Sequence, residues 1–233
     1  MTRSRLAIAA ALALVFAGAA AVPAPGAPLF DQLVVFRNGD AKSETVGTRA
    51  VRTRAGDHRC RVPKATPLAA LVRSRVADLR VLDFSGSCDP SSLFVRAIGP
   101  NRNRGPSGWV YKVGNRQGTT AASDPSGPFG SGRLKRRVRV TWFYCVFESG
   151  GCQRTLGLQA RDQGGGTVSV RVTAYDDEGR GTRLTGARVR AGSRSAETGP
   201  GGLARLRLPS GRHRLYAEKK GYIRSFNERV RVE

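Results

Sequence analysis

Hydrophobic and polar residues alternate along much of the chain, and the period of this alternation predicts a protein built mainly of β-strands. Between residues 29 and 160 the apolar runs are short and end at turn-forming residues; the first, LFDQLVVFRNG at 29–39, ends in an Asn-Gly pair. One segment instead carries apolar residues at helical spacing, namely Leu68, Leu71, Val72 and Val76. Because Thr66 is a good N-cap and Pro67 suits the first helical position, this segment predicts the one helix of the domain.

The last part of the chain alternates more strictly. From residue 167 to 233 short segments carry an apolar residue at every second position, beginning with VSVRVTA at 168–174. Turn-forming sequences such as TGPGG and PSGR separate these segments. About six short strands without a helix are typical of a small β-sandwich. The polar, glycine-rich segment 161–166 predicts a linker between this sandwich and the domain at 29–160.

Two predicted strands concentrate aromatic residues. GWVYKV at 108–113 and VRVTWFY at 138–144 contain both tryptophans of the chain. One interpretation is a core, because large aromatic side chains bring much buried area to a small domain and the sheet needs its apolar face covered by the helix. The other is a ligand-binding surface at the strand ends, since binding residues gather on loops of rigid scaffolds. The candidate ligand-binding residues in this second interpretation are Trp109, Tyr111, Trp142 and Phe129.

The four cysteines predict two disulfides and an oxidising compartment. Cys145 and Cys152 flank VFESGG, which has the composition of a hairpin tip, so we expect them to pair across it. Cys60 and Cys88 would then pair with each other. The spacings do not follow CxxC and no histidine stands suitably beside them, so no metal site is expected.

The N-terminus has the pattern of an export signal: a basic start (MTRSR), an apolar run and small residues at 19–21. This pattern predicts a signal peptide over 1–21 and a Pro/Gly-rich spacer over 22–28. No other stretch is apolar and long enough to cross a bilayer. We therefore expect a secreted protein, extracellular or associated with the cell envelope, that is not bound to a membrane after the signal is cleaved.

Charge is the unusual feature of the composition, with 40 basic and 17 acidic residues and a net charge of +23. The excess is spread along the chain, with +13 in residues 29–165 and +8 in residues 166–233. Such a charge attracts polyanions, among them teichoic acid, acidic polysaccharide, nucleic acid and anionic lipid. The alternative is a solvated basic surface, because many arginines alternate with apolar residues as on the outward faces of strands. Export argues against nucleic acid.

Short motifs of the first domain resemble a secreted domain of bacterial envelope proteins that is similar to the C-terminal β-domain of transcobalamin. These motifs are TPLAAL at 66–71, GWVYKVGN at 108–115 and VRVTWFY at 138–144. The resemblance implies a β-grasp-like α+β fold, in which a curved sheet wraps around one helix. In transcobalamins this domain closes over cobalamin held against a helical barrel. The present sequence predicts no such barrel, so cobalamin binding is not carried over.

The segment 167–233 resembles the carboxypeptidase regulatory-like β-sandwich, a prealbumin-like and Ig-like domain. The motifs that carry this resemblance are GARV at 186–189, TGPGG at 198–202, LRLPSGRHRLYA at 206–217 and KGY at 220–222. The resemblance implies a structural accessory domain without catalysis.

Residues suited to catalysis do not come together in the sequence. The two histidines, His58 and His213, fall in different predicted domains, and paired cysteines leave no thiol nucleophile. No GxSxG or Walker loop occurs. A hydrolase would require His58 to lie beside an aspartate such as Asp57 or Asp83. We therefore do not expect an enzyme.

Together these features predict an exported, non-catalytic binding or envelope-associated module that recognises its ligand through loops of the first domain, including the Gly/Ser/Pro-rich segment 114–133. The expected partner is an envelope polymer, a surface glycan or another protein, and no cofactor is expected. One alternative is a small-molecule, corrinoid-like carrier that acts with a partner chain and has a pocket edged by Trp109 and Trp142. The other alternative is binding of an anionic envelope polymer.

Overall fold

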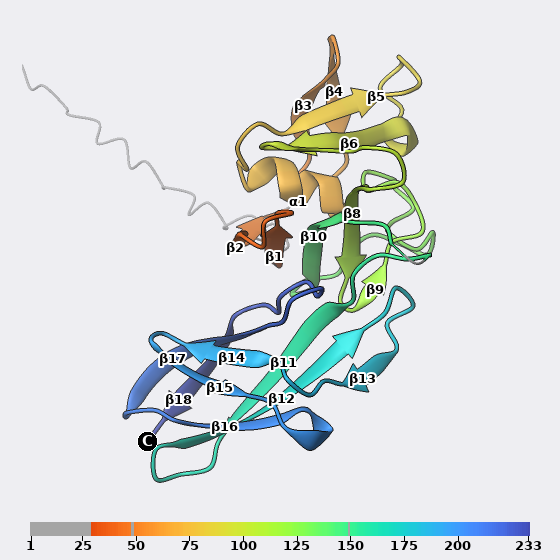
Figure 1. Ribbon diagram of the computed structural model, residues 1–233. Coiled ribbons are helices and arrows are strands. Elements are labelled where there is room, and N and C mark those ends of the chain that lie inside the picture. Colours follow the sequence, from red (N-terminus) through yellow and green to blue (C-terminus); the bar gives the residue numbers. More distant parts are fainter. Residues whose placement is uncertain (1–28, 48, 149) are drawn as a thin grey trace, which may run out of the picture.

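The computed structural model describes residues 29–47, 49–148 and 150–233 (Figure 1). The predicted signal peptide, 1–21, and spacer, 22–28, lie outside the described residues. The predicted fold class is confirmed: the described chain is mainly β, with one short α-helix and four open sheets.

The first domain contains two five-stranded sheets, and the first of them has the strand order β2-β1-β10-β8-β9. Its strands are β1 (Leu29–Val35), β2 (Ala41–Gly47), β8 (Gly108–Val113), β9 (Arg116–Gln117) and β10 (Arg139–Cys145). β1 and β10 run parallel, and the other neighbours are antiparallel. A mixed sheet that joins the first strand to the last in parallel, with a helix on one face, is the expected β-grasp-like arrangement.

The second sheet has the order β4-β3-β5-β6-β7. Its strands are β3 (Val51–Ala55), β4 (His58–Val62), β5 (Arg80–Asp83), β6 (Leu93–Ile98) and β7 (Asn101–Arg102). The helix α1 (Pro67–Arg73) lies between the two sheets (Figure 1), where Leu68 and Leu71 are fully buried. One core therefore serves both sheets and the helix.

The N-terminus of α1 is as predicted. Thr66 is the N-cap, its Oγ1 accepts a hydrogen bond from the Ala69 amide at 3.3 Å, and Pro67 is the first helical residue. The C-terminus comes earlier than the apolar spacing predicted, so Val76 is not helical. The helix ends because Arg75 has a positive φ of 49°, a left-handed conformation that interrupts the helix.

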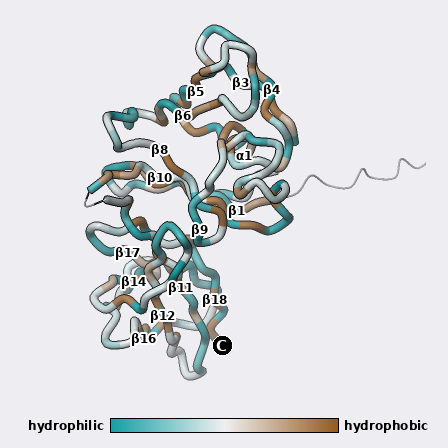
Figure 2. The backbone as a smooth tube through the Cα atoms, turned by 90° about the vertical axis from the view of Figure 1, so that its right-hand side faces the viewer, coloured by the Kyte–Doolittle hydropathy of each residue, from teal (hydrophilic) through white to brown (hydrophobic). Residues whose placement is uncertain are grey.

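The second domain is a sandwich of two four-stranded sheets around a single apolar core. One sheet comprises β11 (Thr155–Asp162), β12 (Thr167–Tyr175), β13 (Gly181–Arg183) and β16 (Leu203–Arg207). The other comprises β14 (Arg188–Ala191), β15 (Arg194–Glu197), β17 (Gly211–Glu218) and β18 (Glu228–Val232). Hydrophobic and hydrophilic stretches alternate along the strands of both domains (Figure 2), as the sequence pattern predicted.

The boundary between the domains lies earlier in the chain than the predicted end of the first domain at residue 160. β11 pairs with β12 along its whole length, and its Leu156 and Leu158 lie in the sandwich core. Residues 161–166 are therefore not a linker: they complete β11 and form the hairpin turn that leads into β12. The apolar residues of β11 point to the same side of the sheet as those of β12, so they are buried in the core of the second domain.

The second domain packs against the face of the first sheet that points away from α1. The apolar part of this contact consists of Leu33, Val35, Phe143, Cys145 and Ile223. Lys112 of β8 reaches into the same interface, where its Nζ donates to the Asp176 carbonyl at 2.7 Å. The first sheet is thus covered on both faces, by the helix on one side and by the sandwich on the other.

Both predicted disulfides, Cys60–Cys88 and Cys145–Cys152, are confirmed. Disulfides of this kind persist in oxidising compartments. Across the described ranges, no helix is both long and apolar enough to cross a bilayer.

Candidate ligand-binding cavity

A cavity of about 230 Å³ opens between the two sheets of the first domain. Its walls come from β6 and the segment between β5 and β6 on one side, from β8 and β10 on the other, and from Gln117 of β9 and the loop that follows it. The aromatic residues that line it are Phe84, Phe94, Trp109, Tyr111 and Trp142. The lining is therefore mostly aromatic and aliphatic, as is usual for pockets that bind small molecules.

Three of the predicted site residues, Trp109, Tyr111 and Trp142, form the floor of the cavity. Tyr111 and Trp142 are directly opposite each other on β8 and β10, with ring centroids 5.3 Å apart. All three side chains are buried and belong to the core cluster of the domain. The same rings therefore both pack the core and line the cavity, and the interpretation of these strands as a ligand-binding surface stays a prediction.

The polar atoms of these rings differ in whether they have partners. The indole N–H of Trp109 donates to the Asn101 carbonyl at 2.8 Å, and the hydroxyl of Tyr111 donates to the Thr120 carbonyl at 2.8 Å. Burial raises the pKa of Tyr111, and the Thr120 hydrogen bond only partly opposes this effect. Trp142 is different: it is 1% exposed, and its Nε1 has no hydrogen-bond partner among the described residues.

A second cavity residue also has a buried polar atom without a partner. The side-chain oxygen of Gln117 is buried, and none of the described residues donates a hydrogen bond to it. A buried donor or acceptor left without a partner costs about 1–3 kcal/mol. Two residues of the mostly apolar lining thus each carry a buried atom without a partner among the described residues: a donor, Trp142 Nε1, and an acceptor, Gln117 Oε1.

Two exposed phenylalanines line the cavity opposite its buried floor. Phe84 is 72% exposed and Phe94 is 39% exposed, and their ring centroids are 5.5 Å apart. The sequence analysis missed both residues. For Phe94 the signal was present, because Leu93 and Val95 on either side are buried and place Phe94 on the outward face of β6. A single exposed apolar residue carries little information, but Phe84 and Phe94 together form an exposed aromatic pair beside the cavity.

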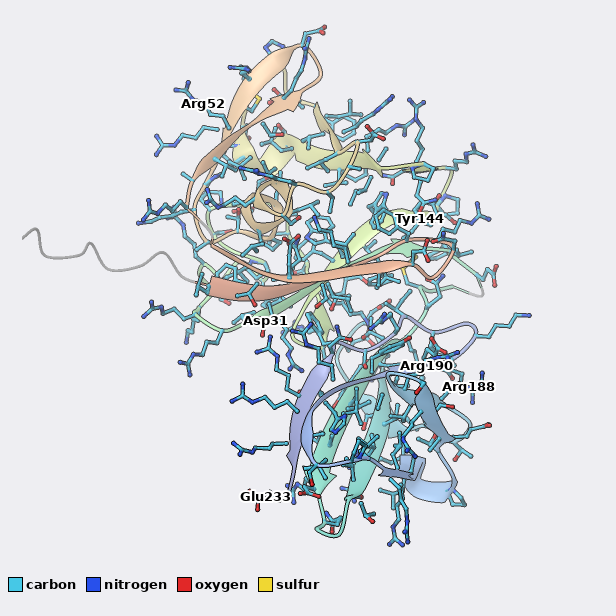
Figure 3. All side chains as sticks on the ribbon, turned by 90° about the vertical axis from the view of Figure 1, so that its left-hand side faces the viewer. Asp31, Arg52, Tyr144, Arg188, Arg190 and Glu233 are labelled. Atoms are coloured by element: carbon cyan, nitrogen blue, oxygen red, sulfur yellow. A yellow bond between two sulfur atoms is a disulfide. The ribbon has the colours of Figure 1, made fainter. Side chains whose placement is uncertain are left out.

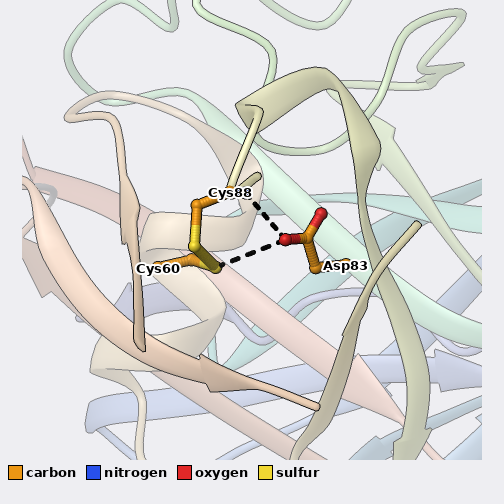
Figure 4. A group of neighbouring side chains, drawn as sticks. All are labelled: Cys60, Asp83 and Cys88. Atoms are coloured by element: carbon orange, nitrogen blue, oxygen red, sulfur yellow. Dashed lines mark hydrogen bonds between the residues drawn. A yellow bond between two sulfur atoms is a disulfide. The ribbon is translucent and has the colours of Figure 1, made fainter. Parts of the chain in front are cut away.

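The loop after β5 is held in place by a carboxylate and a disulfide. Asp83 accepts hydrogen bonds from the hydroxyls of Ser85 and Ser92, both at 2.8 Å, and from the Cys88 amide at 2.7 Å. Figure 4 shows the carboxylate beside the Cys60–Cys88 bond. Partial burial opposes ionisation of Asp83, but these hydrogen bonds outweigh it and lower the pKa to about 2. The residues around Phe84 are therefore anchored at both ends.

The Gly/Ser/Pro-rich segment 114–133 forms another wall of the cavity. The buried hydroxyl of Ser123 donates to the Pro90 carbonyl at 2.5 Å, which ties this loop to the loop after β5. Gly118 lies against the aromatic floor, where an added Cβ would be only 2.0 Å from Cζ of Tyr111. Glycine is therefore required at this position for the loop to close over the ring.

Phe129 is not part of the cavity, although the sequence analysis grouped it with the three floor residues. Its ring is half-buried and lies under the guanidinium of Arg116, 4.9 Å from the ring centroid. The preceding residue, Pro128, accepts a hydrogen bond from the Thr119 amide. The residues that line the cavity do not include Phe129.

Two groups of residues could suggest a metal site or a catalytic site: the Cys60, Asp83 and Cys88 cluster, and His58 with a nearby aspartate. Ligand atoms of Cys60, Asp83 and Cys88 lie within 4.8 Å of one another, but both sulfurs are in the disulfide and offer no thiolate. His58 is exposed at the start of β4, and none of the described hydrogen bonds or ion pairs joins it to Asp57 or Asp83.

A larger groove of about 850 Å³ lies between the β1–β2 turn and the second domain. Its lining is charged rather than apolar, and several of its groups have partners in the structure. The Arg224 guanidinium lies 3.7 Å from the centroid of the Tyr216 ring, and Lys219 donates to the Thr185 carbonyl. The aromatic cavity is therefore the better candidate for ligand binding.

No family model, curated protein or solved structure matches this chain. The resemblances to the transcobalamin C-terminal domain and to the carboxypeptidase regulatory-like sandwich accordingly stay predictions.

Proposed function

We propose that this protein is an exported, non-catalytic binding module whose first domain holds a single ring, or an apolar group of similar size, in the aromatic cavity. The observation that carries the proposal is the indole N–H of Trp142, which is buried in the cavity lining without a partner. Disulfides support export, because such bonds persist outside the cytosol. The anchored loops support binding, because rigid walls reduce the entropy lost when a ligand is held.

The size and polarity of the cavity indicate the chemistry of the ligand. A volume of about 230 Å³ is below the range of roughly 300–1,000 Å³ that is usual for drug-sized ligands. A ring with a short substituent fits such a space, whereas a corrinoid is far too large. A carboxamide substituent would accept a hydrogen bond from Trp142 Nε1 and donate one to Gln117 Oε1. We therefore expect a ring, or a ring-bearing side chain of a partner, that carries an amide.

Benzamide is a suitable probe, with tryptophan fluorescence as the readout because both tryptophans line the cavity. We expect a saturable change in fluorescence with a Kd of about 1 mM, as is reasonable for a ligand with few atoms. Phe84→Ala should weaken binding by about 3- to 10-fold, the effect of losing one aromatic contact. Phe147→Ala is the matched control, because Phe147 is also exposed (43%) but does not line the cavity. An unchanged spectrum, or equal effects of the two substitutions, would contradict the proposal.

A further inference from the structure

Four arginines form a compact block on the outward face of the β17–β18 hairpin. In the antiparallel register two pairs are directly opposite each other: Arg212 with Arg231, and Arg214 with Arg229. All four side chains are exposed, whereas Leu215 and Val232 point into the sandwich core. Directly opposite side chains lie about 5 Å apart at Cβ, and the two pairs are about 7 Å apart along the strands. We call this block, Arg212, Arg214, Arg229 and Arg231, the arginine quartet.

The quartet differs from Arg188 and Arg190 of the same sheet, which lie beside carboxylates. Arg188 is opposite Glu197 on one side and Glu218 on the other, and Arg190 forms an ion pair with Glu218. No hydrogen bond or ion pair of the described residues involves the quartet side chains. Like charges directly opposite each other on a sheet destabilise it. The fold therefore tolerates an unfavourable arrangement at this one place in the sheet.

The quartet lines a surface groove of about 630 Å³. Arg214 and Arg229 also line an adjoining hollow of about 430 Å³ that extends to Arg139 at the domain interface. That hollow is also lined by three carboxylates, Asp31, Glu44 and Glu228, of which Glu228 is paired with Arg139. Figure 3 shows side chains with terminal nitrogen atoms projecting into solvent from the strand that leads to Glu233. The purely basic lining is therefore confined to the groove formed by the quartet.

A similar block of arginines occurs on the β3–β4 hairpin, where Arg52 is opposite Arg61 and Arg54 is opposite Arg59. There, however, Arg54 donates to the Gly56 carbonyl, and Asp57 lines the same hollow. The charge of that block is partly compensated. The β17–β18 quartet is therefore the stronger anion site.

We propose that the arginine quartet binds a linear phosphodiester polymer of the cell envelope. Guanidinium groups bind phosphate oxygens through paired hydrogen bonds, which makes arginine well suited to this anion. A glycerol-phosphate chain has a repeat close to the spacing of about 7 Å between the arginine pairs. The groove is lined by the quartet, His213 and Val230, so it contains no Trp, Tyr or Phe ring for nucleic-acid bases to stack on, and the His213 ring is hydrogen-bonded with the Pro209 carbonyl. This site lies on the second domain and is independent of the aromatic cavity.

The test measures binding of the purified protein to poly(glycerol phosphate) by fluorescence anisotropy. The quartet variant replaces Arg212, Arg214, Arg229 and Arg231 by Gln. The matched control replaces Arg161, Arg171, Arg205 and Arg207 by Gln, four exposed arginines on the opposite sheet of the same domain. Both variants lose four positive charges. We expect the quartet variant to lose at least about 10-fold more affinity than the control, and its log–log salt slope to fall by about 3.

A second variant keeps the charge and the fold. Replacing the quartet by four lysines leaves the net charge unchanged but removes the planar forks, so we expect an affinity several-fold below that of the unsubstituted protein. Equal losses in the two Gln variants would show attraction by overall charge and would overturn the proposal. Tighter binding of polygalacturonate or of single-stranded DNA would also overturn it, because the partner would then belong to another class of polymer. An unchanged affinity of the lysine variant would also overturn the proposal, because positive charge alone would then account for binding.

Discussion

Nζ of Lys112 in the first domain lies 3.1 Å from Oδ1 of Asp177 in the second. The lysine side chain is fully buried, whereas that of Asp177 is 32% exposed. Burial lowers the pKa of Lys112, and the hydrogen bond and charge of Asp177 oppose this shift without cancelling it. The same ammonium donates to the carbonyls of Tyr175 and Asp176, so one side chain fastens the β12–β13 turn to the first sheet. Lys112 therefore connects the two domains at a buried position of their interface.

We expect Lys112→Met to uncouple the two domains. The substitution fills the space but leaves two carbonyls without their donor, so the free energy of unfolding should fall by about 1–3 kcal/mol. Urea unfolding followed by tryptophan fluorescence reports the first domain, and circular dichroism reports both. In the variant the two transitions should separate, whereas they coincide in the parent protein. Lys42→Met is the control, because Lys42 pairs with Glu44 inside the first domain. Coincident transitions at an unchanged midpoint in Lys112→Met would contradict the coupling.

The low pKa of Asp83 predicts a loss of stability in acid. An unfolded aspartate titrates near 3.8 and Asp83 in the folded protein at about 2, so between these values the unfolded chain binds more protons. The stability that Asp83 contributes is therefore present above pH 4 and disappears as the pH falls toward 2. The difference in unfolding free energy between the parent and Asp83→Asn should shrink over this window. Ser92→Ala, which removes one donor, should move the window toward 3.8. If the difference in unfolding free energy between the parent and Asp83→Asn did not vary with pH, the low pKa of Asp83 would be contradicted.

The two disulfides should contribute unequally. Cys60–Cys88 spans 28 residues and Cys145–Cys152 spans 7, and the stabilisation from closing a loop increases with its length. We expect the double substitution of Cys60 and Cys88 by Ala to cost roughly 3–4 kcal/mol, and that of Cys145 and Cys152 about 2–3 kcal/mol. Denaturant unfolding of the two variants measures the order. The first variant should also bind benzamide about 3- to 10-fold more weakly, as Phe84→Ala does, because the disulfide anchors the loop that carries Phe84; unchanged binding would show that the loop does not depend on it.

Features that depend on neighbouring residues in the chain could be predicted from the sequence. The N-cap at Thr66 and the proline after it act within one helical turn, and the Cys145–Cys152 pair follows from a hairpin tip. β2 was missed because it is mostly exposed and lacks an apolar period. β11 was assigned to the wrong domain because its alternation shows that one face is buried but not which core buries it.

Part of the candidate site could be predicted, because strand periodicity is also a local feature of the sequence. Trp109, Tyr111 and Trp142 share one face of two strands, and strand periodicity alone brings them together. The contribution of Phe84 depends on how the second sheet packs over the first, which no local pattern encodes. Phe129 does not line the cavity, and its position could not be predicted because it depends on the course of a long loop whose hydrogen bonds, such as Thr119 N–H to the Pro128 carbonyl, are made between loop residues.

The most direct measurement is the ¹⁵N–¹H spectrum of the two indole N–H groups, with Trp142→Phe used to assign them. The Trp109 indole already donates to Asn101, whereas the Trp142 indole has no partner among the described residues. We predict that benzamide shifts the Trp142 resonance downfield in a saturable manner and leaves the Trp109 resonance nearly unchanged. A Trp142 resonance that stays in place while benzamide binds, or equal shifts of both resonances, would contradict the assignment of the cavity as the binding site.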